Sequence, residues 1–340
     1  MLEKTNVRAG RGKRVSSRGR RLARPSRPSE KAPFFFCFLD FRALLVNCLK
    51  QDNSPEADAL SFDLELVRQA LREDVGSGDV TTLATVPAEA AASALMVARE
   101  PLVACGLPLA EAVFREVSPA VQIERQSQDG QRAQSGQALL RIAGPARGIL
   151  TAERVALNFV QRLSGVATLT ARFVEAVAGT RARILDTRKT TPGWRTLEKY
   201  AVRCGGGTNH RAGLFDRILI KDNHLVALRA EPPNAIEAAV RRARADYPQL
   251  EVEVEADTLE QVEQALVAGA DVILLDNMSN DDLRAAVWLV NGRARTEASG
   301  GVTMATVRAI AETGVDYISV GALTHSARAA DVALDFEVSP

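Results

Sequence analysis

From residue 179 onward, short apolar runs alternate with segments whose apolar residues recur at helical spacing. These runs end on a polar residue or a glycine, at Asp186, Lys221, Glu255, Asp276, Ser299 and Gly321. The last four ends are 21, 23 and 22 residues apart, which is the spacing of a βα repeat. Strands that are apolar almost throughout indicate a parallel sheet buried on both faces. The pattern therefore predicts an α/β barrel or an open parallel sheet.

The chain before residue 179 follows another pattern. Apolar residues at helical spacing predict a helix over residues 64–75, which Gly76 and Gly78 end. From residue 91 to 144, apolar runs separated by glycine and proline predict strands, with one helix over residues 108–117. Residues 151–179 predict two helices broken at Ser164 and Gly165. We therefore expect a first domain of mixed strands and helices that begins near Ser61.

Residues 1–60 differ from the rest of the chain. Arg and Lys recur through residues 1–31 almost without acidic partners, a composition that predicts disorder. The apolar stretch that follows contains Asp40 and Arg42 and is shorter than the ~20 residues that span a bilayer. Three interpretations stay open: an upstream extension foreign to the functional protein, a transit or export signal, and a basic arm that binds a surface or nucleic acid. The lack of a small-residue cleavage pattern after Leu49 disfavours export.

Composition narrows the function classes only slightly. A chain of 340 residues is long enough for about two domains, and its net charge of +1 gives no support to a nucleic-acid or membrane partner. The four cysteines form no CxxC pair and have no histidine at metal-ligand spacing. We therefore expect reduced thiols and a cytoplasmic protein rather than a disulfide or zinc scaffold.

The densest group of cations lies between residues 186 and 225. It comprises Arg188, Lys189, Arg195, Lys199, Arg203, His210, Arg211 and Lys221. The densest of them lie in TRKTTPG and GGGTNHR, among Gly, Pro and Thr, and lack the interleaved acids of a solvated helix face. The stretch therefore predicts an anion site carried on loops.

In either parallel architecture the ligand lies at the carboxyl ends of the strands. Lys221 is then expected beside Arg188 and Lys189, with Glu255 and Asp276 on the adjoining arc. Two glycine turns complete the circle and offer backbone N–H groups to a phosphate at the start of the next helix: Ser299, Gly300, Gly301 and Val320, Gly321, Ala322. Carboxylates that act directly or through water favour Mg²⁺ over Zn²⁺. Together these features predict a site for a polyanion and a divalent metal.

Structural explanations compete at several positions. Asp276 would cap the following helix through its neighbour, and Glu255 would pair with a nearby lysine. His224 would orient a loop, whereas His210, in a glycine-rich turn, is expected to face the ligand. Arg154 would form a surface ion pair on its helix. Neither a Cys/His dyad nor GxSxG occurs, so nucleophilic hydrolysis is unsupported.

Nine short motifs of this sequence together resemble those of one known enzyme family. GSGDVTT, AERVALNFVQRLSGVAT, DTRKTTPG, KYAVRCGGGTNHR, IKDNH, EVEVE, LLDN, SGG and VGALTHS occur in this order. Together they resemble quinolinate phosphoribosyltransferase, the carboxylating nicotinate-nucleotide pyrophosphorylase of NAD synthesis. The resemblance runs from about residue 63 to residue 336. It implies an α/β sandwich domain over residues 61–167, an incomplete, TIM-like α/β barrel over residues 168–324, and residues 325–340 packed on the first domain.

The resemblance also implies an activity. A magnesium-dependent pentosyltransferase would transfer the phosphoribosyl group of phosphoribosyl pyrophosphate to quinolinate, with release of CO₂ and pyrophosphate, as a homodimer with shared active sites. The implied substrate-binding residues are Arg154, Thr187, Arg188, Lys189, His210, Arg211, Lys221, Glu255, Asp276 and the two glycine turns. Arg154 would come from the partner subunit. The implied catalytic residues are Lys189, Lys221, Glu255 and Asp276, and the last two would also hold the metal, through water.

Three alternatives remain beside this interpretation. A related phosphoribosyltransferase would use another anionic heterocycle, although three arginines favour a dicarboxylate. A non-catalytic protein would bind nucleic acid or membrane through the basic arm. A barrel aldolase would work through Lys221.

Overall fold

The computed structural model describes residues 64–337, so the interpretations of residues 1–60 and the domain start at residue 61 lie outside the described residues. The helices are α3 (Leu64–Val75), α4 (Val80–Thr85), α5 (Leu107–Val117), α6 (Ala146–Ala176), α7 (Arg195–Cys204), α8 (Asp222–Ala227), α9 (Ala235–Asp246), α10 (Leu259–Ala268), α11 (Asn280–Val290), α12 (Val307–Ala311) and α13 (Ala322–His325). The strands are β1 (Ala91–Ala98), β2 (Leu102–Val103), β3 (Gln122–Arg125), β4 (Arg132–Ala133), β5 (Ala138–Pro145), β6 (Arg183–Leu185), β7 (Ile218–Ile220), β8 (Val252–Ala256), β9 (Val272–Asp276), β10 (Arg295–Ser299), β11 (Tyr317–Ser319) and β12 (Val332–Glu337).

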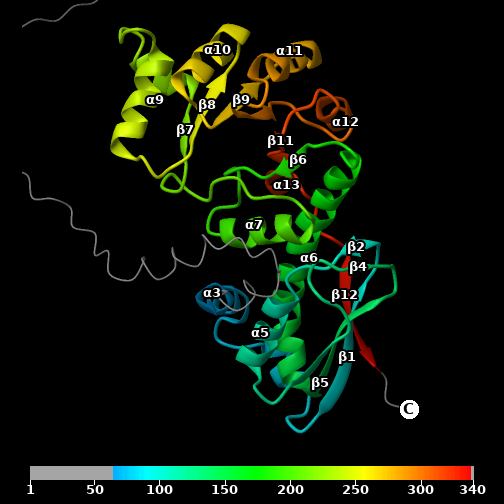
Figure 1. The fold of residues 1–340 in the computed structure, drawn as a ribbon. Helices are drawn as coiled ribbons and strands as arrows, with labels where there is room; N and C mark the ends of the chain where they lie inside the picture. The colour runs from blue at the N-terminus through cyan, green and yellow to red at the C-terminus, as the bar shows by residue number, and fades with distance from the viewer. Residues whose placement is uncertain (1–63, 338–340) are drawn as a thin grey trace, which may run out of the picture. The chain divides into compact units, whose positions relative to one another are not determined.

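The first sheet is antiparallel and pairs the first described strand with the last. Its strand order is β12-β1-β5-β3, with Ala94 opposite Phe336 and opposite Ile142. In Figure 1 the red β12 lies beside the cyan β1 for this reason. Helices α5 and α6 pack together and α6 contacts β1, β5 and β12, which buries the apolar positions of the sheet. The last described strand is therefore part of the first sheet.

The second sheet is parallel and open. Its order is β6-β11-β10-β9-β8-β7, so β6 and β7 are edge strands that are not bonded to each other. Every residue of β8 is buried. This agrees with the prediction, made from the apolar runs, of strands covered on both faces. Beside β6, Thr208 forms an isolated parallel bridge with Leu185. The predicted βα repeat and the incomplete barrel are confirmed.

The prediction of two helices over residues 151–179 is wrong. Helix α6 runs without a break for 31 residues. Ser164 and Gly165 are buried tertiary contacts of this helix: the Ser164 hydroxyl accepts from the Cys105 N–H at 2.9 Å, and a Cβ added at Gly165 would lie 2.0 Å from the carbonyl oxygen of Arg328. Glycine stands here because another chain segment passes close to the helix, which sequence spacing does not reveal.

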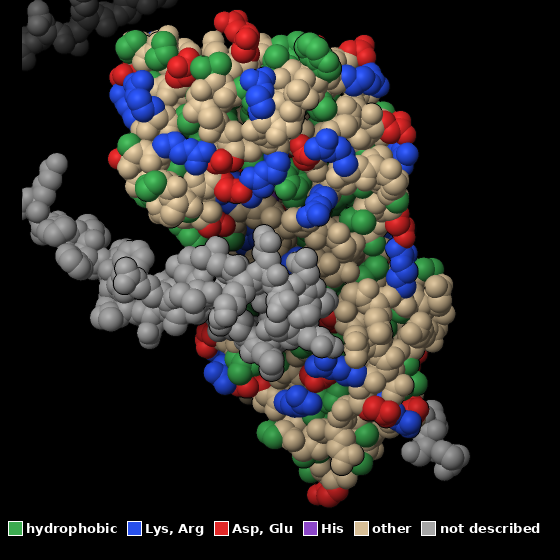
Figure 2. Space-filling view, viewed as in Figure 1, with side chains coloured by type: hydrophobic (Ala, Val, Ile, Leu, Met, Phe, Trp, Pro, Cys, Tyr) green, Lys and Arg blue, Asp and Glu red, His purple; other side chains and the backbone are tan. Residues whose placement is uncertain are grey.

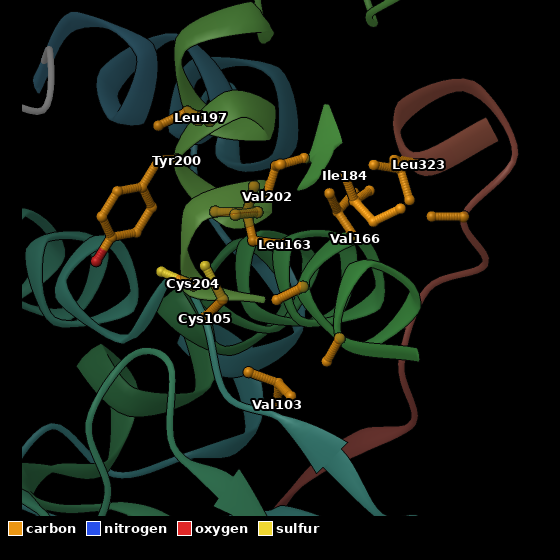
Figure 3. Packing of buried hydrophobic residues seen from close by; sticks show 14 of the residues in the cluster. Val103, Cys105, Leu163, Val166, Ile184, Leu197, Tyr200, Val202, Cys204 and Leu323 are labelled. Carbon is orange, nitrogen blue, oxygen red and sulfur yellow. The ribbon is translucent and has the colours of Figure 1, made fainter. Parts of the chain in front are cut away.

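Helix α6 also packs against the start of the barrel. Figure 3 shows Leu163 and Val166 of α6, Val202 of α7 and Ile184 of β6 in one buried cluster. Phe159 of α6 stacks on Trp194, with ring centroids 5.1 Å apart. The segment between β6 and α7, which carries the DTRK motif, is thus placed by apolar contacts with the long helix.

The visible surface of the barrel carries both signs of charge. Lys and Arg side chains lie beside Asp and Glu side chains there and form no field of a single sign (Figure 2). Within residues 64–337, none of the helices combines the length and the apolar composition that a bilayer-spanning helix needs.

Candidate active site

The predicted site residues of the barrel lie at the carboxyl ends of its strands. Arg188 and Lys189 follow β6, and Lys221 follows β7 as the N-cap residue of α8. Glu255 and Asp276 lie at the ends of the neighbouring strands β8 and β9. Because parallel strands end on the same rim, loops far apart in the sequence meet there.

Two guanidinium groups, those of Arg188 and Arg211, lie close enough to repel each other. Arg188 Nε is buried and has no hydrogen-bond partner among the described residues. Burial first, and then the charge of Arg188, lowers the pKa of Arg211. Two partly buried cations that repel each other form a site that an anion stabilises.

Arg195 connects the loops that carry these two arginines. Its guanidinium donates to the Arg188 carbonyl at 3.4 Å, to the Thr190 hydroxyl at 3.1 Å and, from Nη1, to the Ala212 carbonyl at 3.1 Å. Thr187 acts locally, because its hydroxyl accepts from the Lys189 N–H at 3.1 Å. The two cationic loops are therefore joined by direct bonds.

The acidic arc lies next to Lys221. The Lys221 ammonium donates to Glu255. This is the pairing with a nearby lysine that the structural explanation of Glu255 predicted. Asp276 is half-buried and accepts from Asn277 Nδ2 at 2.7 Å, but Ser279 caps α11, so Asp276 is not the helix cap. His224 Nδ1 accepts from the Lys221 N–H at 2.9 Å and so orients the loop.

The glycine turns differ in their relation to helices. Gly300 has φ +94°, and a Cβ there would lie 2.1 Å from Asn277 Oδ1, so this turn packs directly on the Asp276 turn. Helix α12 begins only at Val307, and the expectation that the first turn opens a helix is wrong. Gly321 is the N-cap of the short α13, and Lys189 Cδ lies 3.1 Å from where its Cβ would stand. The second turn therefore approaches the cationic loop.

His210 points into the barrel rather than toward solvent. Only 8% of it is exposed, Nδ1 accepts from the Arg211 N–H at 2.7 Å, and Nε2 lies 3.0 Å from Glu253 and 3.6 Å from Glu297. Both ring nitrogens thus contact protein groups. The contact between this ring and a ligand that the sequence suggests stays a prediction.

Glu253 and Glu297 come from the alternate strands β8 and β10 and meet in one interior layer of the barrel. Ligand atoms of these carboxylates and His210 lie within 4.8 Å of one another, an arrangement that could hold a cation. Burial, and then the charge of Glu253, raises the pKa of Glu297, so a proton can also neutralise the pair. Sequence analysis missed both residues, although a glutamate inside an otherwise apolar strand was the available signal.

A second group of metal-ligand type lies between the two domains. It consists of Cys105, Asp129 and Cys204, with the two sulfur atoms close together in Figure 3. Asp129 is already occupied, because its oxygens accept from the N–H groups of Gly106 and Leu107 and from the Tyr200 hydroxyl. This carboxylate is therefore a structural acceptor and a poor candidate for a metal ligand.

Arg154 is the predicted site residue that stays apart from the barrel rim. It is exposed on α6 and lines a pocket of about 340 Å³ with Asp74, Asp79 and Thr151. The residues that line this pocket all belong to the first domain. Within one chain, Arg154 therefore does not join the cations of the barrel.

Comparisons with known proteins match both domains of this geometry. The sequence models for the N-terminal and C-terminal domains of quinolinate phosphoribosyl transferase match residues 79–164 and 166–335. The nicotinate-nucleotide pyrophosphorylase [carboxylating] of Mycobacterium leprae is 48% identical over 80% of this chain and 96% of its own length. The chloroplastic protein of that name from Oryza sativa is 44% identical over 82% of this chain and 78% of its own.

Solved structures agree with the sequence matches. The nicotinate-nucleotide pyrophosphorylase of Ehrlichia chaffeensis has a TM-score of 0.77 and 40% identity, covering 82% of this chain and all of that chain. The Francisella tularensis protein has a TM-score of 0.76 and 40% identity, covering 80% and 95%. The resemblance identified from the motifs is confirmed, and the chain belongs to the quinolinate phosphoribosyl transferase family.

Proposed function

We propose that this protein transfers the phosphoribosyl group of phosphoribosyl pyrophosphate to quinolinate and releases CO₂, giving nicotinate mononucleotide and pyrophosphate. The names of its relatives and the family support this reaction. The observation that carries it is the pair of cations Arg188 and Arg211, because the buried Nε of Arg188 has no hydrogen-bond partner within residues 64–337.

Quinolinate is a flat dicarboxylate, and planar guanidinium forks give the bidentate geometry that such carboxylates prefer. We assign the two carboxylates to Arg188 and Arg211. Lys189, which is exposed and packs near Gly321, serves the anionic substrates from the rim. His210 supports Arg211 through the bond between its ring and the Arg211 N–H.

Phosphoribosyl pyrophosphate and its metal are assigned to the acidic arc. Glu255 and Asp276 lie on neighbouring strands and offer hard oxygen atoms. Mg²⁺ is commonly held by one or two carboxylates together with substrate phosphates, so these residues fit it, through water. When bound, the metal would neutralise the pyrophosphate charge. Lys221 would lie beside the same phosphates, and the turns at Gly300 and Gly321 would offer backbone N–H groups.

The chemistry needs no covalent intermediate with the protein. The ring nitrogen of quinolinate attacks the ribose carbon as pyrophosphate leaves, and the carboxylates of Glu255 and Asp276 stabilise the positive charge that develops there. The ribosylated nitrogen is cationic and accepts the electron pair when the 2-carboxylate leaves as CO₂. A proton then replaces CO₂ on that carbon. The substrate itself is the electron sink, so Lys221 acts by charge and not as a Schiff base.

We also propose a homodimer with shared sites in the cytoplasm. Arg154 is an exposed cation of the first domain, distant in the fold from the barrel rim, and a twofold partner would place it over the opposite rim. Cys105 and Cys204 are buried free thiols whose sulfur atoms lie near each other, which suits a reducing compartment.

Mixing the protein with quinolinate, phosphoribosyl pyrophosphate and Mg²⁺ tests the activity. We expect CO₂ and nicotinate mononucleotide in equal amounts, and loss of both when Mg²⁺ is chelated. Product formed from nicotinate but not from quinolinate would refute the assignment of a dicarboxylate substrate.

A further inference from the structure

The carboxylate of Asp186 joins the two loops that carry Arg188 and Arg211. Asp186 follows β6 directly and is fully buried. Its Oδ1 accepts from the His210 N–H at 2.8 Å and from the Lys199 ammonium, and its Oδ2 accepts from Asn209 Nδ2 at 2.6 Å. One side chain therefore binds residues on α7 and in the loop that follows α7.

Lys199 and Asn209 complete the connection. The Lys199 ammonium also donates to the His210 carbonyl at 2.9 Å, and Asn209 Nδ2 also donates to the Lys199 carbonyl at 2.9 Å. Both backbone polar groups of His210 are thus bound by the Asp186–Lys199 pair. Thr208 donates its N–H to the Ile184 carbonyl at 2.8 Å, which sets residues 208–210 along the open edge of β6.

Stability alone does not explain this buried pair. Burial raises the pKa of Asp186 and lowers the pKa of Lys199, so for each group burial outweighs the attraction of the other. A buried ion pair is often no more stabilising than apolar residues of the same volume. What the pair supplies instead is geometry, because it holds residues adjacent to each substrate-binding arginine.

We propose that Asp186, Lys199 and Asn209 are positioning residues that set the spacing between Arg188 and Arg211, and so select a dicarboxylate with adjacent carboxyl groups. Arg188 lies two residues after Asp186, and Arg211 follows His210 directly. A shift of about 1 Å between the two guanidinium groups would leave one carboxylate poorly bound. This inference rests on the proposed function and deepens it.

The test separates positioning from stability. Asp186→Asn leaves Lys199 buried without a counter-charge and should lower the Tm strongly. The double variant Asp186→Asn, Lys199→Met removes both charges at nearly constant volume, and it should recover most of that Tm. Asn209→Ala keeps the ion pair and removes only the bonds of the amide. Glu111→Gln is the matched control, because Glu111 is a buried carboxylate of α5 paired with Arg125.

We expect the double variant and Asn209→Ala to raise the KM for quinolinate by about 10- to 100-fold while the KM for phosphoribosyl pyrophosphate changes less than about threefold. Inhibition by phthalate, a dicarboxylate, should weaken far more than inhibition by benzoate. Glu111→Gln should lower the Tm without changing either KM. Wild-type values for quinolinate and phthalate in a folded double variant, or equal losses for both substrates, would overturn the inference. Inactive wild-type protein would instead refute the proposed function.

Discussion

Replacing Gly165 by alanine has two opposing effects on stability: a gain in helix propensity and a steric clash with another segment. In a helix interior, alanine is favoured over glycine by about 1 kcal/mol. At this position, however, the new Cβ would lie 2.0 Å from the Arg328 carbonyl oxygen and 3.0 Å from its carbon. Carbon and oxygen approach to about 3.3 Å even in weak C–H···O contacts, so the backbone near residue 328 must move by more than ~1 Å.

That backbone is bound to α6 and cannot move freely. Ala330 donates its N–H to the Gln161 carbonyl at 2.9 Å, Gln161 Nε2 donates to the Val332 carbonyl, and Arg162 Nη1 donates to the Ala327 carbonyl, both at 2.8 Å. Overpacking costs about 1–3 kcal/mol, and each weakened bond adds about 1 kcal/mol. After subtracting the gain in helix propensity, we expect Gly165→Ala to destabilise the protein by about 2 kcal/mol.

Thermal unfolding followed by circular dichroism would measure this as a Tm lower by about 4–8 °C. Asn158→Ala is the control, because Asn158 is exposed on the same helix and gains helix propensity without a clash. Its Tm should stay the same or rise slightly. A Gly165→Ala protein that melts at or above the wild-type temperature would show that the segment after α13 is not held against α6.

The remaining predictions concern the site. Arg188→Lys should weaken quinolinate binding by about 1.5–3 kcal/mol, measured by calorimetry, and nicotinate binding less; equal losses would place Arg188 on a phosphate. Asp276→Asn should raise the KM for phosphoribosyl pyrophosphate and the Mg²⁺ requirement but leave quinolinate affinity unchanged, whereas a joint loss would indicate a structural role. Arg154→Ala and Lys221→Ala should each be inactive, yet mixing them with subunit exchange should restore up to about a quarter of wild-type activity, and none if each site uses its own Arg154. The raised pKa of Glu297 means that its stabilising proton is fully bound below the ordinary glutamate pKa and lost as pH rises through the folded value. Because of this group, the wild-type protein should lose up to ~1.4 kcal/mol of unfolding free energy per pH unit from pH 5 upward, measured by urea unfolding. Glu297→Gln should not show this loss, and parallel pH profiles for the two proteins would contradict the prediction.

The barrel and most of its rim could be predicted from local information. The apolar runs that end at Lys221, Glu255 and Asp276 are strands of one parallel sheet, and register alone brings their ends to one rim. The cations around Arg188 and Arg211 were visible as residues beside glycine and threonine, where they could not be paired along a helix. Such features depend on residues close in the sequence, so the sequence by itself determined them.

Other features depend on segments that meet only after folding. The sequence around Gly165 predicts a helix break, because nothing in it places the Arg328 carbonyl beside this glycine. The sequence does not reveal that His210 lies beside the carboxylates of Glu253 and Glu297, because these residues follow 43 and 87 positions later on other strands. A buried charge goes where a partner offsets its desolvation, and partners distant in the sequence are chosen only by the tertiary structure.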